Sequence, residues 1–262
     1  MANSDLITFL PSFVGSKSYW VDDVRFLTKN SRDFVEPFAG SAVLSANCAK
    51  TAYLNDLDPI LCHILEHFDE QIVPDEFTRE MFYQVRGEKD WWKYAFCLSR
   101  MAFSGIFRHT TKGGFNVQAK KGKNYEKVCV REQYLAALAR WKKLKPTVVS
   151  GSYLDLDPLT FEGKAVILDP PYAGSVAWDN WCQNLGKRTH FNYFEYWEYV
   201  NKVRKYADIV IVFEKRDNLF RRFEVADVLF YKQKIIHVNG KYSQSIDAMI
   251  SLTTIKEEKS LI

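Results

Sequence analysis

The sequence predicts an α/β protein with a mostly parallel sheet, helices on both faces of the sheet, and a mostly helical lobe inserted into the chain. Two observations support this class. Apolar runs typical of strands alternate with helical segments up to about residue 70, and the alternation returns after about residue 147. Between these points it stops, and the sequence becomes helical, aromatic and basic. In such a sheet the ligand site lies at the carboxyl ends of the strands.

The first part of the sheet is predicted from a strand–helix–strand pattern. The apolar run at 33–38 breaks into a turn of small residues and then a helix at 43–49. A second strand at 51–54 ends in a polar, acidic segment and Pro59, after which 60–68 returns to helical spacing. These residues therefore form two neighbouring strands, each followed by a helix.

The second part of the chain supplies the remaining strands. In chain order we expect strands at 147–150 and 165–168, a helix at about 194–206, a β-branched strand at 209–213, and a closing hairpin formed by 232–238 and 248–254. We therefore assign 1–70 and 148–262 to one domain and 71–147 to the inserted lobe.

The inserted lobe is basic, whereas the rest of the chain is acidic. Residues 71–147 contain 16 Lys or Arg and 7 Asp or Glu, while the remainder contains 20 and 25. This imbalance is typical of a lobe that contacts nucleic-acid phosphates, although a solvated surface without a partner has the same composition.

Composition argues against several classes of protein. No run approaches the roughly 20 apolar residues of a membrane helix, and the first residues lack a basic segment before an apolar core, so we expect a cytoplasmic protein. The five cysteines are widely spaced without a Cys-x-x-Cys pair, which predicts buried free thiols. Three histidines, His63, His67 and His237, show no partner at ligand spacing, so no metal site is expected.

A short glycine turn indicates a cofactor site. Gly40 lies between the first strand and its helix, where backbone N–H groups can approach a ligand. Asp56 ends the next strand, where a carboxylate can accept both hydroxyls of a ribose. The turn departs from a dinucleotide fingerprint because Ala42 takes the third small position. A turn of this kind also occurs without any ligand.

The most specific motif is Asp169-Pro170-Pro171-Tyr172, directly after an apolar strand. The two prolines fix the backbone and remove two donors, so the loop is stiff and its carbonyls can accept. Asp169 and the Pro170 carbonyl can then accept both N–H bonds of a planar amine, while Tyr172 stacks on its ring. We expect the ring of Tyr172 to matter more than its hydroxyl.

Together these motifs resemble the Dam-like family of adenine-N6 DNA methyltransferases, in which a cofactor motif precedes a recognition domain and the Asp-Pro-Pro-Tyr motif follows it. The resemblance covers nearly the whole chain and implies a Rossmann-like methyltransferase sheet with S-adenosylmethionine as methyl donor. It implies catalytic roles for Asp169, Pro170, Pro171 and Tyr172. The implied cofactor-binding residues are Phe13, Gly15, Lys17, Glu36, Pro37, Phe38, Ala39, Gly40, Ser41, Asp56, Ser152, Tyr153 and Asp169.

The inserted lobe also resembles this family. Residues 107–117 are similar to its recognition hairpin, with an Arg followed by Gly-x-Phe-Asn-Val, but Gln118-Ala119-Lys120-Lys121 replaces the usual Pro and Phe-Gly ending. The DNA target is therefore open, from a GATC site to little sequence preference. The residues that we expect at DNA are Arg108, Lys112, Asn116, Lys120, Lys121 and Lys123. The fork of Arg108 matches guanine in the major groove, and a phosphate contact is the alternative.

The resemblance implies methyl transfer to an adenine flipped out of double-stranded DNA, by a monomer or weak dimer in a bacterial or phage-infected cell. Two alternatives stay open: an amino-methyltransferase that acts on adenine or guanine in RNA, and an inactive DNA-binding homologue, for which Ala42 is the only support. Cytosine-C5 chemistry is not expected, because Cys129 and Cys182 do not follow a proline as that nucleophile would.

Overall fold

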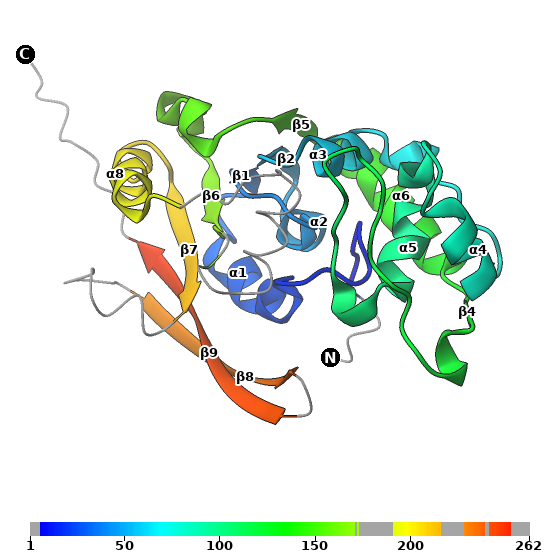
Figure 1. The fold of residues 1–262 in the computed structure, drawn as a ribbon. Helices are drawn as coiled ribbons and strands as arrows, with labels where there is room; N and C mark the ends of the chain where they lie inside the picture. The colour runs from blue at the N-terminus through cyan, green and yellow to red at the C-terminus, as the bar shows by residue number, and fades with distance from the viewer. Residues whose placement is uncertain (1–5, 171, 173–190, 216–227, 239–240, 253–262) are drawn as a thin grey trace, which may run out of the picture.

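The computed structural model describes residues 6–170, 172, 191–215, 228–238 and 241–252 (Figure 1). Of the residues from 215 to 248 it describes the backbone of the strands alone. Its main sheet has seven strands in the order β5-β2-β1-β6-β7-β9-β8. The first five strands of this order run parallel, while β9 pairs antiparallel with both β7 and β8. The expectation of a mostly parallel sheet is confirmed.

The strand bounds follow the sequence pattern closely at the start of the sheet. In chain order the strands are β1 (Asp33–Glu36), β2 (Thr51–Asp56), β5 (Thr147–Ser150), β6 (Ala165–Leu168), β7 (Ile209–Lys215), β8 (Val228–Val238) and β9 (Lys241–Leu252). The closing hairpin forms, but β9 begins seven residues before the predicted start at 248. Residues 253 and 254, which were predicted to end this strand, lie outside the described part.

Helices pack on both faces of the sheet. One face contributes Phe34, Leu54 and Ile167 to a core that also contains apolar residues of α1 (Val21–Leu27), α2 (Val43–Cys48) and α3 (Pro59–Glu66). The other face contributes Val35 and Val166 to a second core, which is closed by α8 (Tyr193–Val203). Because neighbouring strand residues point to opposite faces, Phe34 and Val35 enter different cores. The helix α1 was not predicted.

The inserted lobe, residues 71–147 between α3 and β5, lies at the right of Figure 1. It contains a two-stranded pair of β3 (Phe77–Thr78) and β4 (Lys127–Val128), with α4 (Arg79–Val85), α5 (Ala95–Met101) and α6 (Arg131–Leu144). Short 3₁₀ helices span Ser18–Trp20, Phe68–Glu70, Trp91–Tyr94, Phe103–Gly105, Lys123–Tyr125, Tyr153–Asp155 and Pro158–Phe161. The core on the first sheet face continues into the lobe without a break.

The helix α6 ties the lobe to the sheet. The Arg140 guanidinium donates from Nε to the Ala46 carbonyl at 2.6 Å, and also to the carbonyls of Ser45 and Ala49. These carbonyls end α2, where a helix leaves acceptors unsatisfied and favours a positive charge. Trp141 packs edge-on against Phe9 with ring centroids 4.9 Å apart. The end of the lobe is therefore anchored to the sheet domain.

Candidate active site

The carboxyl end of β2 presents Asp56 to the glycine turn that follows β1. Asp56 Oδ2 accepts the Gly40 N–H at 3.0 Å, and Oδ1 accepts the Asp58 N–H at 3.0 Å. Burial raises the pKa of the Asp56 carboxyl to about 6, although the N–H donors of Asp58 and Gly40 act in the opposite direction. The carboxylate therefore holds two loops together, and with roughly four acceptor positions it has capacity for further donors.

The turn after β1 has two residues in left-handed conformation, Gly40 with φ of 49° and Ala42 with φ of 50°. The ring of Phe13 lies over this turn, 3.4 Å from where a Cβ of Gly40 would be. Ala42 therefore keeps the backbone geometry that favours glycine, at a strain on the order of 1–2 kcal/mol. Although alanine takes the place of glycine at position 42, the turn still forms.

Glu36, the last residue of β1, faces α2. Its Oε1 accepts hydrogen bonds from the Ser45 N–H at 2.8 Å and from the Ser45 hydroxyl. Burial raises the pKa of Glu36 to about 7, while the two Ser45 donors lower it and the nearby Asp169 charge raises it further. The structure thus shows Glu36 holding α2 beside the turn. Ser41 is also buried.

The end of β6 carries Asp169 into a compact polar cluster with Lys17. Lys17 Nζ lies 2.6 Å from Asp169 Oδ2 and donates to the Gly15 carbonyl at 2.8 Å. The Tyr172 hydroxyl donates to Asp169 Oδ1 at 3.1 Å, so this hydroxyl has a partner that the sequence did not predict. Lys17 Nζ also lies 5.3 Å from the centroid of the Tyr172 ring. Pro170 is buried, whereas Pro171 lies outside the described residues.

An aromatic cluster lies beside the glycine turn, between the ends of β1 and β5. The rings of Phe38 and Tyr153 have centroids 5.0 Å apart, and Phe191 lies 5.8 Å from Tyr153. The turn of Tyr153 is fixed by Ser152, whose hydroxyl accepts the Leu154 N–H at 3.2 Å. Phe191 is not among the cofactor residues expected from the sequence, but the structure places it beside Phe38 and Tyr153. Its only sequence signal was its aromatic character.

Residues 107–117, the predicted recognition hairpin, form a turn closed by one isolated bridge between His109 and Phe115. The Asn116 N–H donates to the Arg108 carbonyl at 3.1 Å, and Arg108 Nε donates to Asn116 Oδ1 at 2.8 Å. Two residues expected at DNA therefore contact each other across the hairpin. Lys112 is exposed near the hairpin tip.

Comparison with known proteins places these features in a family. The sequence profile of the D12 class N6 adenine-specific DNA methyltransferases matches residues 13–244. Two relatives, both described as DNA adenine methylase of Vibrio cholerae serotype O1 (strains O395 and N16961), are 24% identical over 265 residues, covering 92% of this chain and 94% of theirs. The chain belongs to the D12 class N6 adenine-specific DNA methyltransferase family.

Among solved structures, a Pyrococcus horikoshii protein provisionally described as an RNA methyltransferase is 11% identical over 94% of both chains, with a TM-score of 0.45. This likeness is too low to argue from. The D12 family match confirms the resemblance stated from the motifs, and the chain is an adenine-specific DNA methyltransferase. Membership in this family implies that S-adenosylmethionine is the methyl donor.

The basic residues of this D12 family member divide into two groups. Several arginines of the lobe bind its own backbone: Arg86 donates to the Val117 carbonyl at 2.7 Å, and Arg131 to the Val73 carbonyl at 3.2 Å. Lys120 is half-buried, and its Nζ donates to the Arg100 carbonyl at 2.9 Å. By contrast, Lys121 and Lys123 are exposed. The charge excess of the lobe is therefore partly structural.

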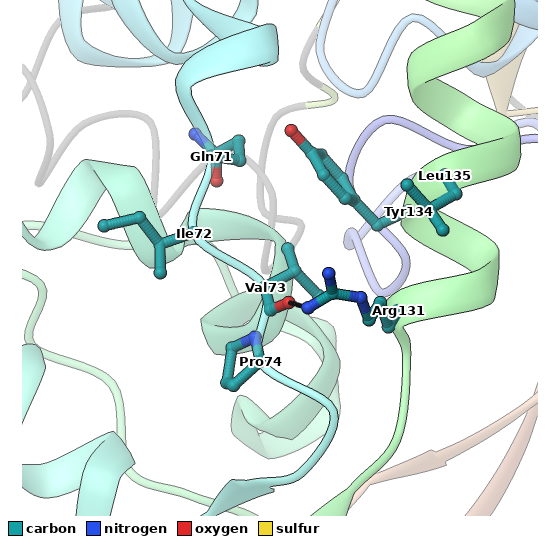
Figure 2. Close-up of a pocket in the computed structure, with 7 residues that line it drawn as sticks. All are labelled: Gln71, Ile72, Val73, Pro74, Arg131, Tyr134 and Leu135. Atoms are coloured by element: carbon teal, nitrogen blue, oxygen red, sulfur yellow. Dashed lines mark hydrogen bonds between the residues drawn. The ribbon is translucent and has the colours of Figure 1, made fainter.

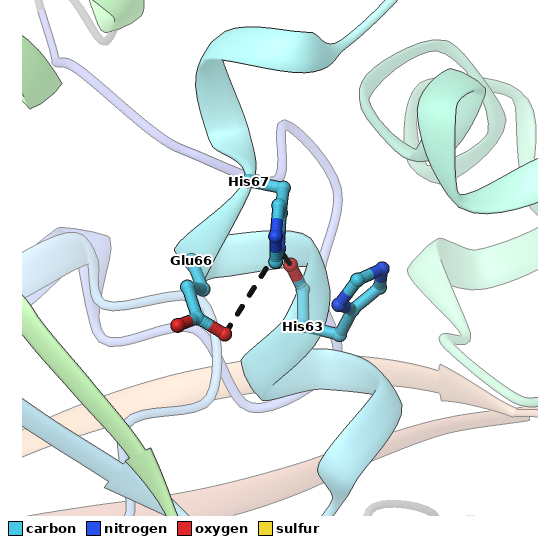
Figure 3. A group of neighbouring side chains, drawn as sticks. All are labelled: His63, Glu66 and His67. Carbon is cyan, nitrogen blue, oxygen red and sulfur yellow. Dashed lines mark hydrogen bonds and ion pairs between the residues drawn. The ribbon is translucent and has the colours of Figure 1, made fainter.

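The expectation that His63 and His67 lack a partner at ligand spacing is wrong. They lie one helical turn apart on α3, and with Glu66 they place candidate ligand atoms within 4.8 Å of one another (Figure 3). These three side chains could hold a metal ion. His67 Nδ1 already contacts the His63 carbonyl at 3.0 Å. The group lies at the carboxyl end of α3, whereas Asp56 ends β2 before this helix begins.

A surface pocket of about 280 Å³ lies in the lobe, between the segment that precedes β3 and the start of α6 (Figure 2). Its lining includes Tyr134, Leu135 and Ile72, and contains none of the residues predicted to bind cofactor or DNA.

Among the described residues, Cys48, Cys62 and Cys97 are buried free thiols, but Cys129 is exposed, contrary to expectation. No helix in the described segments has the length and apolar character needed to cross a membrane.

Proposed function

We propose that this chain transfers a methyl group from S-adenosylmethionine to the exocyclic amine of an adenine flipped out of duplex DNA. The order β2-β1-β6 carries this proposal, because it puts Asp56, the glycine turn and Asp169 at three adjacent strand ends. Adjacent strands lie roughly 4.8 Å apart, so a cofactor above β1 reaches the residues that follow both neighbours. A donor and an acceptor of the methyl group can then meet at Asp169.

The residues present fit S-adenosylmethionine, which supplies an electrophilic methyl group when bound. Asp56 offers a partly exposed carboxylate, the group that accepts ribose hydroxyls, beside a turn with glycine-like backbone. The rings of Phe38 and Tyr153 offer apolar surface for an adenine ring. Lys17 contacts both Gly15 and Asp169, so it links the loop before α1 to the catalytic carboxylate.

Asp169 prepares the target amine for attack. Its carboxylate and the Pro170 carbonyl accept the two N–H bonds of N6, which directs the nitrogen lone pair along the line of methyl transfer. S-adenosylmethionine would supply the methyl group that N6 takes up and would leave as S-adenosylhomocysteine, and the proton that N6 loses would pass to the Asp169 carboxylate or to water. The Asp169 carboxylate stabilises the positive charge that develops on N6, and Lys17 holds this carboxylate in position through the 2.6 Å ion pair. Tyr172 stacks on the extruded base.

We also propose that 71–147 is the DNA-recognition lobe, with 1–70 and 148–262 as the catalytic domain. Arg108 supports this assignment because Asn116 holds its guanidinium, accepting from Nε at its side-chain oxygen at 2.8 Å and from Nη2 at its backbone carbonyl at 3.4 Å. The guanidinium N–H groups outside these two bonds can contact a guanine edge or a phosphate. The exposed Lys112, Lys121 and Lys123 are placed to contact phosphates.

The test is transfer of labelled methyl from S-adenosylmethionine to duplex DNA and to ribosomal RNA, followed by single-molecule mapping of modified adenines. We expect transfer to duplex DNA, its loss in Asp169→Asn, and cofactor binding by calorimetry in both proteins. Cofactor and DNA binding without transfer by the wild type would favour an inactive homologue. Faster transfer to RNA would overturn the DNA substrate for this chain.

A further inference from the structure

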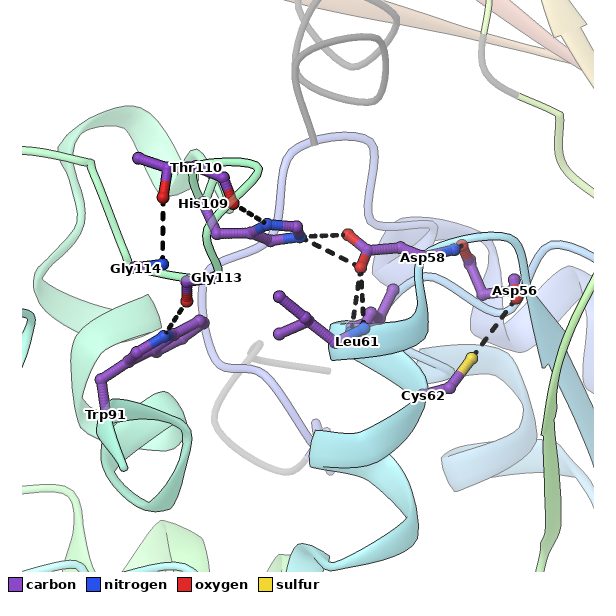
Figure 4. A network of polar contacts seen from close by, with 10 residues as sticks. Asp56, Asp58, Leu61, Cys62, Trp91, His109, Thr110, Gly113 and Gly114 are labelled. Carbon is purple, nitrogen blue, oxygen red and sulfur yellow. Dashed lines mark hydrogen bonds and ion pairs between the residues drawn. The ribbon is translucent and has the colours of Figure 1, made fainter. Parts of the chain in front are cut away.

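A buried contact joins the recognition hairpin to the end of β2. His109 Nε2 lies 3.0 Å and 2.9 Å from the two carboxylate oxygens of Asp58 (Figure 4). Their side chains are only 3% and 4% exposed. The two residues are 51 positions apart in sequence, so the contact exists only in the folded chain.

Asp58 also belongs to the cofactor side of the molecule. Its Oδ1 accepts the N–H groups of Ile60 at 3.0 Å and Leu61 at 3.3 Å, which caps the first turn of α3. Its own N–H donates to Asp56, whose carboxylate accepts the Gly40 N–H. A continuous chain of hydrogen bonds thus runs from the glycine turn through Asp56 and Asp58 to His109.

The hydrogen bonds of His109 indicate its charge. Its Nδ1 lies 3.1 Å from the Thr110 carbonyl, which only accepts, so Nδ1 carries a proton. Nε2 faces a carboxylate and is best satisfied as a second N–H donor. Burial alone would lower the pKa of His109, but the hydrogen bond and charge of Asp58, with the Thr110 carbonyl, raise it. The imidazolium form therefore fits both contacts.

The hairpin is held by hydrogen bonds within it and by contacts with neighbouring elements. The Thr110 N–H donates to the Gly114 carbonyl at 2.8 Å, and the Gly114 N–H donates to the Thr110 hydroxyl at 3.1 Å. Trp91 Nε1 donates to the Gly113 carbonyl. A Cβ built on Gly113 would lie 3.7 Å from Ile60 Cδ1, so the tip also lies against the first turn of α3. The hairpin therefore contacts the start of α3 at two points, through His109 and through its tip.

We propose that the Asp58–His109 pair is a positioning contact that couples cofactor binding to DNA binding. This rests on the proposed roles of Asp56 and of the recognition hairpin. When a ribose orders Asp56, the hydrogen bond to the Asp58 N–H fixes Asp58, and His109 then fixes the hairpin in the orientation that meets DNA. Coupling is reciprocal, so DNA that orders the hairpin must strengthen cofactor binding by the same factor.

The test measures DNA affinity by fluorescence anisotropy of a duplex oligonucleotide, with and without saturating S-adenosylhomocysteine, which cannot donate a methyl group. The ratio of the two dissociation constants is the coupling factor. In the wild type we expect this factor to be on the order of 5- to 150-fold. In His109→Ala it should fall toward 1, whereas His109→Gln, which keeps an N–H donor near Nε2, should restore most of it.

Thr110→Val is the matched control. It removes a hydrogen bond inside the same hairpin but leaves the Asp58 contact, so DNA affinity can fall while the coupling factor stays at the wild-type value. If His109→Ala acted only by a general loss of hairpin structure, His109→Ala and Thr110→Val would both lose DNA affinity and would have similar coupling factors. An unchanged factor in folded His109→Ala, or no coupling in a wild type that methylates DNA, would overturn the proposal.

Because His109→Ala leaves Asp58 buried without this partner, it can fail to fold. In that case amide hydrogen exchange of the wild type tests whether cofactor binding orders the hairpin. S-adenosylhomocysteine should slow exchange across 107–117, and unchanged exchange there would refute the coupling. A wild type that binds cofactor and couples but transfers no methyl group would overturn the proposed function and leave this inference standing. A wild type that binds no cofactor would overturn both.

Discussion

Breaking the ion pair between Lys17 and Asp169 should lower the free energy of unfolding, even when no cofactor or DNA is bound. The side chain of Lys17 is 6% exposed and that of Asp169 is 24% exposed, with 2.6 Å between Nζ and Oδ2. Removing one partner of a buried pair costs about 3–5 kcal/mol. Because Lys17 keeps its bond to the Gly15 carbonyl and water can enter beside Asp169, we expect about 2–3 kcal/mol for Asp169→Ala.

Lys17→Met should cost less, about 1–2 kcal/mol, because the more exposed Asp169 keeps the Tyr172 hydroxyl and can be hydrated. The double variant should lose about 1–3 kcal/mol less than the sum of the single variants, as expected for groups in direct contact. Urea unfolding of all four proteins without cofactor measures this cycle. Both proteins that lack Asp169 should also show no methyl transfer.

The exposed pair of Arg25 and Asp22 provides a control cycle. Its atoms are 2.9 Å apart, but the side chains are 47% and 71% exposed, so its coupling should be at most about 0.5 kcal/mol. If the coupling free energy of the Lys17–Asp169 cycle is as small as that of the Arg25–Asp22 cycle, the contact does not stabilise the fold. In that case Lys17 does not hold the catalytic carboxylate in place.

Four further predictions follow from the site. Glu36→Gln should gain stability relative to wild type as pH rises from about 4.5 to 7, reaching about 1–3 kcal/mol at pH 8, because the raised pKa of about 7 keeps Glu36 protonated in the folded protein while the unfolded chain already ionises it; a difference in unfolding free energy between the two proteins that does not change with pH would contradict this. Asp56→Asn should weaken cofactor binding in calorimetry by about 1.5–3 kcal/mol, the scale of a hydrogen bond to a charged group, and equal affinity would place the ribose acid elsewhere. Tyr172→Phe should lower the rate constant for methyl transfer by roughly 2- to 12-fold, equivalent to about 0.5–1.5 kcal/mol, because the hydroxyl bond to the catalytic carboxylate is lost; a wild-type rate in single-turnover assays would assign the role to the ring alone. Replacing both Lys121 and Lys123 by Ala should reduce the slope of log affinity against log salt by up to about 0.9 per lost phosphate contact, on all duplexes alike, and an unchanged slope would remove these lysines from the interface.

The sequence by itself determined the elements whose signals are local. β5 and β6 begin and end where the sequence pattern predicts, because a short run rich in β-branched or apolar residues between turn residues is a local strand signal. The start of α3 follows from Asp58 and Pro59, a capping side chain followed by a residue with its φ already fixed. The Asp-Pro-Pro-Tyr motif is likewise a contiguous pattern, so the family could be named before the fold was known.

The tertiary structure alone decided which of these side chains meet. Lys17, which precedes α1, and Asp169, which follows β6, are 152 residues apart and meet only in the folded chain. His109 reaches Asp58 only because the lobe folds back on α3. The lobe's basic composition could not reveal that Arg86 binds a backbone carbonyl instead of facing solvent. Sequence period and turn chemistry fix a residue's element and face, whereas its partner depends on strand order and lobe placement, which arise from packing across the whole chain.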